Sequence, residues 1–316
     1  MSQKKIIAVI GATGAQGGGL ARAIAADPHG PFTARAITRN TGSDKAKALA
    51  AAGIEVVAGD ADHPASLDAA FRGAYGAFCV TNFWEHNSVD REGEQASAMA
   101  RATRKAGLQH VIWSTLEDTR EIVPLTDPRM PVLHGKYNVP HFDSKGQVDR
   151  VFTTEGAPTT FLRAAFYWDN FIYFGAGPKR GADGQLAITM PIGNAKMAGV
   201  AAEDVGKVAY GIFKQGPSLV GKKIGVAGEH LTGDQIAQAM TKKIGKTITF
   251  NNVEPNVYRS FGFPGADDLG NMFQFYRDFE QVCNDMRNVE RARELAPGLQ
   301  TFDQWLSAHA KEIPLE

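Results

Sequence analysis

The sequence predicts an α/β protein with a doubly wound parallel sheet and a smaller α+β domain at its C-terminal end. Short apolar runs alternate with longer amphipathic stretches through the first half of the chain, and this regular pattern loosens after Ser114. Strict alternation of strands and helices implies right-handed crossovers, and therefore a parallel sheet with helices on both faces. At 316 residues the chain is also long enough for more than one structural unit.

The elements of the first half follow one another closely. Compact apolar runs predict buried strands, and apolar residues spaced three and four apart predict helices. The predicted strands are residues 5–10, 32–38, 55–58, 76–80 and 110–114, and the predicted helices are residues 17–26, 43–52, 64–72 and 90–106.

The second half begins with residues 117–140, which contain four prolines and few apolar positions, so we expect a long loop over the carboxyl edge of the sheet. Thr232 is a suitable N-cap for one of the later helices. The elements predicted beyond the loop are helices 142–154, 204–214 and 232–244 and strand 159–164.

These elements suggest a division into two domains. Residues 1–165, joined by residues 195–228, are expected to form the larger domain, and residues 166–194 and 229–316 the smaller one. Closely spaced aromatic residues at positions 261–279 could line a pocket of the smaller domain or form its core.

Composition excludes several classes of protein. The 34 basic residues balance 34 acidic ones, so no nucleic acid or anionic membrane is expected as a partner. No apolar run approaches the roughly 18 residues of a membrane span, and no signal peptide is apparent, so we expect a cytoplasmic protein. Two cysteines, Cys79 and Cys283, are too few for a thiolate metal site, and no metal is predicted. Cys79 is expected to be a buried structural thiol.

The strongest functional motif is the glycine-rich stretch that follows the first strand and opens the first helix. Glycines there permit a tight turn and close backbone approach to a pyrophosphate, whose charge the free N–H groups of the helix stabilise. The motif predicts that a dinucleotide binds at Gly11, Thr13, Gly14, Ala15, Gln16 and Gly17.

The end of the second strand distinguishes NAD from NADP. An acidic residue there would bind the ribose hydroxyls, whereas a basic one accepts a 2′-phosphate. The strand is followed by Arg39 and Asn40, with Lys45 nearby, so NADP(H) is the predicted coenzyme. The alternative is that Arg39 is a solvated surface arginine.

Polar residues also follow the third and fourth strands. Asp60, with Ala61 after it, could bind near the adenine or cap the following turn. Thr81, Asn82 and Phe83 follow the fourth strand and are expected to line the cofactor crevice.

Five stretches together resemble the NmrA-like family of atypical short-chain dehydrogenase/reductases: residues 11–18, 80–85, 141–146, 262–266 and 271–276. The resemblance covers nearly the whole chain. It implies an NADP-binding domain of the Rossmann type and a smaller domain for a substrate or a protein partner.

The resemblance also assigns residues to the cofactor site. It places the phosphate loop on residues 11–17, the 2′-phosphate on Arg39, and a cofactor-contacting lysine on Lys145. It implies that Tyr167 and Asn170 lie beside the nicotinamide, although the aromatic residues there could simply belong to the core.

Catalytic residues are harder to assign. Active short-chain dehydrogenases use Tyr-x-x-x-Lys, in which the tyrosine transfers a proton and the lysine assists it. This chain has His141 four residues before Lys145, and Tyr137 lies too far back to replace the tyrosine. His141 could donate the proton or be a surface or capping residue, and Ser114 could polarise a carbonyl or bond to the local loop.

Two functions therefore remain. The first is a redox sensor or regulator that responds to NADPH, which we favour because the usual proton donor is missing. The second is an NADPH-dependent oxidoreductase with Lys145 in its active site, acting on a small carbonyl, quinone, enone or imine. The partners expected besides NADP(H) are a small-molecule substrate or a regulatory protein, and the chain could form a homodimer.

Overall fold

The computed structural model describes residues 3–316. Its centre is a seven-stranded sheet in which all neighbouring strands are parallel, in the order β11-β6-β5-β4-β1-β2-β3. The bounds are β1 Lys5–Ile10, β2 Phe32–Thr38, β3 Glu55–Ala58, β4 Gly76–Cys79, β5 His110–Thr115, β6 Thr159–Arg163 and β11 Lys223–Gly225. The strand order reverses between β1 and β4, which makes the sheet doubly wound, as predicted.

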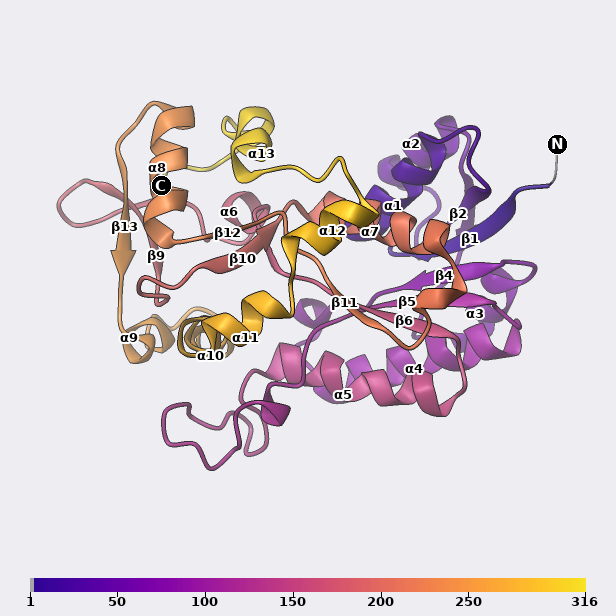
Figure 1. Cartoon of the computed structure of the whole chain (residues 1–316), viewed down its shortest axis with the longest axis horizontal. Coiled ribbons are helices and arrows are strands. Elements are labelled where there is room, and N and C mark those ends of the chain that lie inside the picture. The colour runs from indigo at the N-terminus through magenta and orange to yellow at the C-terminus, as the bar shows by residue number, and fades with distance from the viewer. Residues whose placement is uncertain (1–2) are drawn as a thin grey trace.

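Helices cover both faces of this sheet (Figure 1). One face carries α1 (Ala15–Ala25), α2 (Asp44–Ala51), α7 (Ala202–Gln215) and α12 (Val289–Leu295), and the other carries α3 (Pro64–Phe71), α4 (Val89–Lys105) and α5 (Pro140–Thr154). Ser43 caps α2 through its side chain. The helix α5 begins two residues earlier than predicted, because Pro140 fits the first turn, where a helix needs no N–H.

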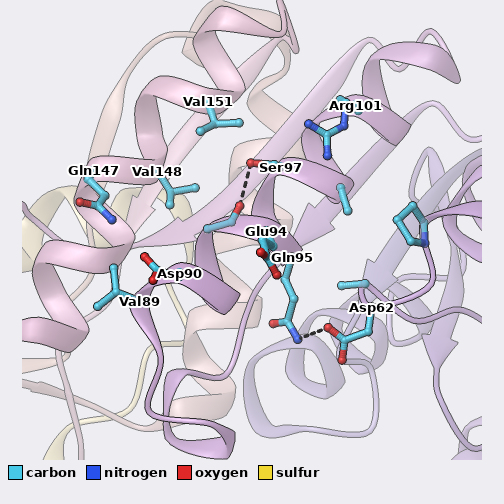
Figure 2. A pocket seen from close by; sticks show the side chains of 14 residues that line it. Asp62, Val89, Asp90, Glu94, Gln95, Ser97, Arg101, Gln147, Val148 and Val151 are labelled. Atoms are coloured by element: carbon cyan, nitrogen blue, oxygen red, sulfur yellow. Dashed lines mark hydrogen bonds between the residues drawn. The ribbon is translucent and has the colours of Figure 1, made fainter.

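A groove of about 650 Å³ opens on the outer surface of α4 and α5 (Figure 2). Polar residues dominate one side of it, where the Gln95 side chain donates a 2.9 Å hydrogen bond to Asp62. Apolar residues of α5, including Val148 and Val151, line the opposite side.

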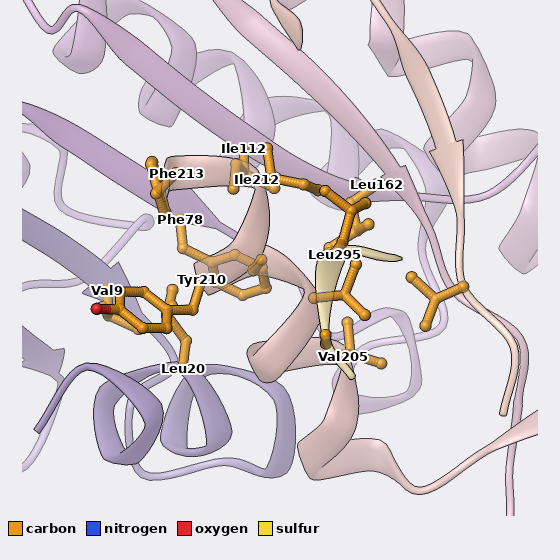
Figure 3. Packing of buried hydrophobic residues seen from close by; sticks show 14 of the residues in the cluster. Val9, Leu20, Phe78, Ile112, Leu162, Val205, Tyr210, Ile212, Phe213 and Leu295 are labelled. Carbon is orange, nitrogen blue, oxygen red and sulfur yellow. The ribbon is translucent and has the colours of Figure 1, made fainter. Parts of the chain in front are cut away.

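The sheet and the α1/α7 face share one apolar core (Figure 3). Phe78 and Ile112 from the sheet meet Leu20 of α1 and Ile212 and Phe213 of α7, all with at most 1% of their surface exposed. Each such side chain contributes roughly 1.5–3 kcal/mol by leaving water. This packing fixes α1, and with it the glycine-rich turn, against the sheet.

The C-terminal part adds two small sheets and most of the remaining helices (Figure 1). One sheet has the order β12-β10-β7 and the other β13-β9-β8. The strands are β7 Phe166–Tyr167, β8 Lys179–Arg180, β9 Leu186–Met190, β10 Met197–Val200, β12 Glu229–Leu231 and β13 Ile248–Asn252. The helices are α6 Asn170–Tyr173, α8 Gly233–Ile244, α9 Pro255–Arg259, α10 Ala266–Asp278, α11 Glu280–Asp285 and α13 Phe302–His309. Thr232 caps α8 through a capping box with Gln235, as predicted.

A buried ion pair joins the C-terminal part to the carboxyl end of the central sheet. Arg287 donates to both carboxylate oxygens of Glu117, at 2.9 and 2.7 Å, and to the carbonyl of Ala164 at 2.7 Å. Burial disfavours the charge on Arg287, but the adjoining carboxylate outweighs it and holds the pKa of the guanidinium above its usual value. The two parts are therefore fixed to each other just beyond the end of β5.

The division into two domains stays a proposal, and its first two residues lie outside the described part. Two observations support the proposed return of residues 195–228 to the larger domain. The strand β11 pairs with β6, and α7 packs along α1. Between residues 3 and 316, no helix has the length and apolar character needed to cross a membrane.

The aromatic residues at positions 261–279 divide into two groups. Phe273, Phe275 and Tyr276 are buried in the core of the C-terminal part, whereas Phe261 and Phe263 are exposed. The cluster is therefore mainly core, with an exposed end at the turn before α10.

Candidate functional site

The residues predicted to bind a cofactor meet at the carboxyl edge of the sheet. Most of them lie in the loops that follow β1, β2, β3 and β4, whereas Lys145, Tyr167 and Asn170 belong to α5, β7 and α6. The strand order reverses between β1 and β4 at this edge. Open parallel sheets bind ligands at such a reversal, where adjacent loops diverge and leave a crevice.

The glycine-rich turn has the geometry that its sequence predicts. Gly11 has a positive φ of 66°, which favours glycine, and a Cβ atom on Gly17 would lie 2.6 Å from the Gly11 carbonyl oxygen. Gly14 begins α1 without a side-chain cap, and the first turn holds no acidic residue. The N–H groups at the start of α1 are therefore left for an anion such as a diphosphate.

Gln16 connects this turn to two other strands. The Ser114 hydroxyl on β5 donates a 2.7 Å hydrogen bond to Oε1 of Gln16, and Nε2 of Gln16 donates a 2.7 Å bond to the Tyr167 hydroxyl on β7. Burial raises the pKa of Tyr167, so this phenol stays protonated. The hydroxyl proton of Ser114 is already engaged, which disfavours it as a group that polarises a carbonyl.

Arg39 lies exposed at the end of β2, where a 2′-phosphate is expected. Its guanidinium forms an ion pair with Glu85, which belongs to the short helix η1 (Phe83–Glu85). Hydrogen bonding to Glu85, with the charges of Asp60 and Asp62, raises the pKa of Arg39. A phosphate at this position would therefore compete with a carboxylate of the protein itself.

The neighbouring polar residues are mostly engaged in local turns. The Asn40 side chain accepts from the Gly42 amide at 2.9 Å, and the Asp60 carboxylate accepts from the Asp62 amide at 3.0 Å. Asp60 thus stabilises the turn before α3, which is the alternative role that the sequence left open. Asn82 is exposed after β4, and Asn170 is half-buried at the start of α6.

Lys145 lies on α5 and reaches the end of β4. Its ammonium group donates to the Thr81 carbonyl at 3.2 Å, to the Thr81 hydroxyl at 2.8 Å and to Oε1 of Glu92 at 2.7 Å. The fully buried carboxylate of Glu92 also accepts hydrogen bonds from the hydroxyls of Thr81 and Ser144. These contacts hold the Lys145 ammonium group rigidly beside the end of β4.

Glu92 was not predicted from the sequence, although a signal for it exists. It lies four and seven residues before Ala96 and Met99, so it shares the buried face of α4 with them. An acidic residue on the apolar face of a helix needs a partner, and Lys145 is the partner here.

His141 is buried rather than on the surface, with 6% of its area exposed. Its Nδ1 lies 2.6 Å from Oδ1 of Asp268, and its backbone N–H donates to Oδ2 of the same carboxylate at 3.1 Å. The rings of Trp84 and Phe142 lie 4.8 and 4.7 Å away. The sequence did not predict Asp268, which lies 127 residues further along the chain.

The groove in Figure 2 does not belong to this site. Of the predicted residues it contains only Ala61, and its lining includes neither the glycine-rich turn nor His141 or Lys145. Within residues 3–316, no three His, Cys, Asp or Glu side chains are grouped so that they could hold a metal ion. Cys79 and Cys283 are buried, and burial raises the pKa of both thiols.

The parallel sheet, the glycine-rich turn after its first strand and the lysine beside the end of β4 define a Rossmann-type protein of the atypical short-chain dehydrogenase/reductase class. The chain belongs to the NmrA-like family, whose sequence profile matches residues 3–306. The family resemblance predicted from the sequence is thereby confirmed.

Comparison with known proteins agrees with this assignment. The NmrA-like family domain-containing oxidoreductase FrzB of Cladobotryum sp is 27% identical over 292 residues, covering 85% of this chain and 83% of FrzB. NmrA, a negative transcriptional regulator, in complex with NADP, has a TM-score of 0.77 at 24% identity and covers 97% of this chain and 95% of its own. Citrobacter sp. triphenylmethane reductase complexed with NADP(H) has a TM-score of 0.73 at 22% identity, with coverages of 96% and 99%. The two structures support the fold.

Proposed function

We propose that the protein is an NADPH-dependent oxidoreductase that reduces a small carbonyl, quinone, enone or imine. The observation that carries the proposal is the uncapped start of α1, which lies at the same sheet edge as Arg39 and the anchored Lys145. Several relatives, FrzB among them, are named oxidoreductases, and two similar structures contain NADP or NADP(H).

The residues at the edge fit each end of this coenzyme. The free N–H groups after Gly14 would bind the diphosphate, and Arg39 would bind the 2′-phosphate after separating from Glu85. Thr81, Asn82 and Phe83 would line the path toward Lys145, and Tyr167 and Asn170 would lie beside the nicotinamide. Bound NADPH would supply a hydride to the substrate.

The test has two parts. NADPH and NADH are titrated by fluorescence, and NADPH oxidation is then followed with menadione, cyclohexenone and a cyclic imine. We expect tight NADPH binding and turnover with at least one of these compounds. Turnover should disappear in Lys145→Ala and persist in Lys246→Ala, which changes an exposed lysine far from the crevice. Failure to bind either coenzyme would contradict the proposal.

A second candidate function is an NADPH-responsive regulator, and the loop after β4 favours it. Glu85 in this loop pairs with Arg39, while the neighbouring Trp84 ring lies against Gly265, where an added Cβ would approach it to 2.9 Å. A 2′-phosphate that displaced Glu85 would therefore disturb a contact with the C-terminal part. Such a ligand must bind two conformations with different affinities to act as a signal.

Hydrogen exchange distinguishes this regulator from an enzyme that simply binds coenzyme. If phosphate binding at Arg39 moves the loop after β4, NADPH but not NADH is expected to change amide hydrogen exchange in residues 257–266. Equal exchange with both coenzymes, or no change with either, would argue against it. Coenzyme-dependent sedimentation would separately test the proposed homodimer and any regulatory protein partner.

A further inference from the structure

We infer that His141 and Asp268 form a proton-donating dyad, in which Asp268 orients the imidazole and Nε2 of His141 protonates the substrate. This inference rests on the proposed reductase function and names the group that replaces the missing tyrosine. His141 would be the catalytic residue, and Asp268 a positioning residue that acts through it.

Asp268 binds His141 through both of its carboxylate oxygens. One carboxylate oxygen binds the ring at Nδ1, at 2.6 Å, and the other binds the backbone N–H, at 3.1 Å. That backbone N–H lies in the first turn of α5, where amides have no partner within the helix and a carboxylate is electrostatically favoured. Both side chains are nearly buried, with 8% and 7% exposed. The ring therefore has a single orientation.

The contact with Asp268 leaves one ring nitrogen of His141 available to a ligand. A carboxylate accepts only, so Nδ1 must carry hydrogen, and Nε2 is the atom that can exchange a proton with a ligand. No polar group in the described chain, residues 3–316, bonds to Nε2, and it is not among the fully buried polar atoms that lack a partner. Nε2 thus keeps contact with solvent, although the ring around it is almost enclosed.

His141 lies one helical turn before Lys145, on the same face of α5, and its ring packs beside Phe83 and Trp84 in the loop that follows β4. Thr81 in the same loop anchors Lys145. A substrate at Nε2 would meet aromatic side chains, which favours a planar conjugated molecule such as a quinone or an enone.

Other candidate donors are less well placed. Lys145 directs its three hydrogens to Thr81 and Glu92, and the Ser114 hydroxyl donates to Gln16. The Tyr167 hydroxyl accepts from Gln16 and keeps its own proton, so Tyr167 is the rival that the experiment must separate.

NADPH would supply the electrons of the reduction, and His141 would supply the proton. The hydride from NADPH brings two electrons to one end of the conjugated carbonyl system, and NADP⁺ remains. The C=C π electrons shift to form a new double bond with the carbonyl carbon, and the carbonyl π pair moves to oxygen. The donor is the imidazolium form of His141, and its N–H bond at Nε2 breaks as the new O–H bond forms, which leaves a hydrogen on Nδ1 only. Water then returns a proton to the neutral imidazole, while Asp268 keeps the hydrogen bond at Nδ1. A quinone gives first the keto tautomer of its hydroquinone. The ring carbon that took the hydride then loses a proton and the second oxygen gains one, so one NADPH and one proton are consumed in all.

The kinetic test uses menadione with NADPH and four variants. His141→Ala should lose about 10²- to 10⁴-fold in kcat, the usual contribution of a general acid, and Asp268→Asn about 10²-fold. The dissociation constant of NADPH, measured by fluorescence, should change less than about 2-fold, because neither residue belongs to the proposed coenzyme contacts. Added imidazole should restore rate to His141→Ala only. Asp267→Asn, on the exposed neighbour of Asp268, should keep most of the activity. Tyr167→Phe, which removes the rival hydroxyl, should lower kcat less than His141→Ala does.

Nitrogen NMR of the wild-type protein supplies a readout that needs neither turnover nor a folded variant. Selectively labelled His141 should show a hydrogen on Nδ1 in its neutral form and a bare Nε2. The opposite tautomer in the wild type would overturn the inference, and so would full activity in Asp268→Asn or a loss of activity confined to Tyr167→Phe. If wild-type protein turned over menadione under those outcomes, the proposed function would still stand. NADPH binding without turnover of any probe would overturn both.

Discussion

Removing the buried carboxylate of Glu92 should destabilise the protein strongly. Glu92 has no exposed surface and accepts hydrogen bonds from Lys145 and from the hydroxyls of Thr81 and Ser144. Glu92→Leu keeps a similar volume but leaves the ammonium of Lys145 with no opposite charge. Breaking one partner of a buried ion pair costs roughly 3–5 kcal/mol. We expect about 3 kcal/mol, the lower end, because 13% of the Lys145 side chain is exposed and water can solvate it in part.

A double-mutant cycle tests the origin of this cost. Glu92→Leu combined with Lys145→Met should recover most of the lost stability, because apolar replacement of a whole buried pair is often neutral. Urea unfolding measures each free energy, and the slope with urea should not change. Glu94→Leu, on the exposed face of the same helix, should lie within about 0.5 kcal/mol of the wild type. A cost below about 1 kcal/mol for Glu92→Leu would refute the argument that this pair is held away from water.

Three further predictions concern the coenzyme site and the sheet. Arg39→Ala should weaken NADPH binding about 10- to 100-fold in titrations, the equivalent of one charge-assisted hydrogen bond, while NADH binding changes little. The control is Arg72→Ala, which changes an exposed arginine at the other end of the sheet. Equal losses of affinity for both coenzymes would disprove the assignment of Arg39. Gly17→Ala should weaken the binding of both coenzymes alike and lower the midpoint of thermal unfolding, because its Cβ would lie 2.6 Å from the Gly11 carbonyl oxygen. Gly93→Ala should raise that midpoint, because a Cβ there meets nothing within 4 Å and alanine favours a helix. Burial lowers the pKa of His110 from 6.5 to about 4. Between pH 4 and 6.5 the unfolded state therefore binds a proton that the folded state does not bind. The free energy of unfolding should fall relative to His110→Gln by about 1.4 kcal/mol per pH unit as pH is lowered through that window, and parallel pH profiles would contradict this.

The comparison with His110→Gln is needed because Asp149 titrates in the same range with the opposite sign. Burial raises the pKa of Asp149 from 3.8 to about 6, so the folded state keeps a proton there that the unfolded state releases, and stability falls as pH rises. The wild-type profile alone would therefore show little slope. For His110 the geometry explains the direction: the Thr160 hydroxyl donates to the Leu219 carbonyl and so accepts from Nε2, which leaves Nδ1 buried without an acceptor.

The central sheet could be predicted from the sequence because its signals are local. Each of the strands β1 to β6 is an apolar run bounded by turn residues, and the predicted ends differ from the structure by at most one residue. The strand β11 was missed because its three residues, 223–225, have no periodicity and become a strand only by pairing with β6. The same holds for the two-residue strands β7 and β8, whose conformation depends on their neighbours.

The residues of the candidate site also differ in whether the local sequence is enough to predict them. The roles proposed for the glycine-rich turn and for Arg39 depend on short stretches of chain, so the local sequence is enough to predict them. Glu92 could have been found from its place on the buried face of α4. Glu85 and Asp268 could not, because their importance comes from contacts with residues on other elements, and nothing in their own neighbourhood marks them.

Coenzyme binding and proton transfer are expected to depend on different parts of the chain. The expected contacts to the diphosphate and the 2′-phosphate all come from the loops after β1 and β2, whereas the ring of His141 is oriented by α10 of the C-terminal part. Coenzyme affinity should therefore survive changes in α10 that remove the hydrogen bond to Nδ1, while proton transfer should not. A chain that only sensed NADPH would need no imidazole held at Nδ1 by a buried carboxylate, since coenzyme binding requires no proton. The contact between His141 and Asp268 is for this reason the feature that most favours an enzyme over a pure sensor.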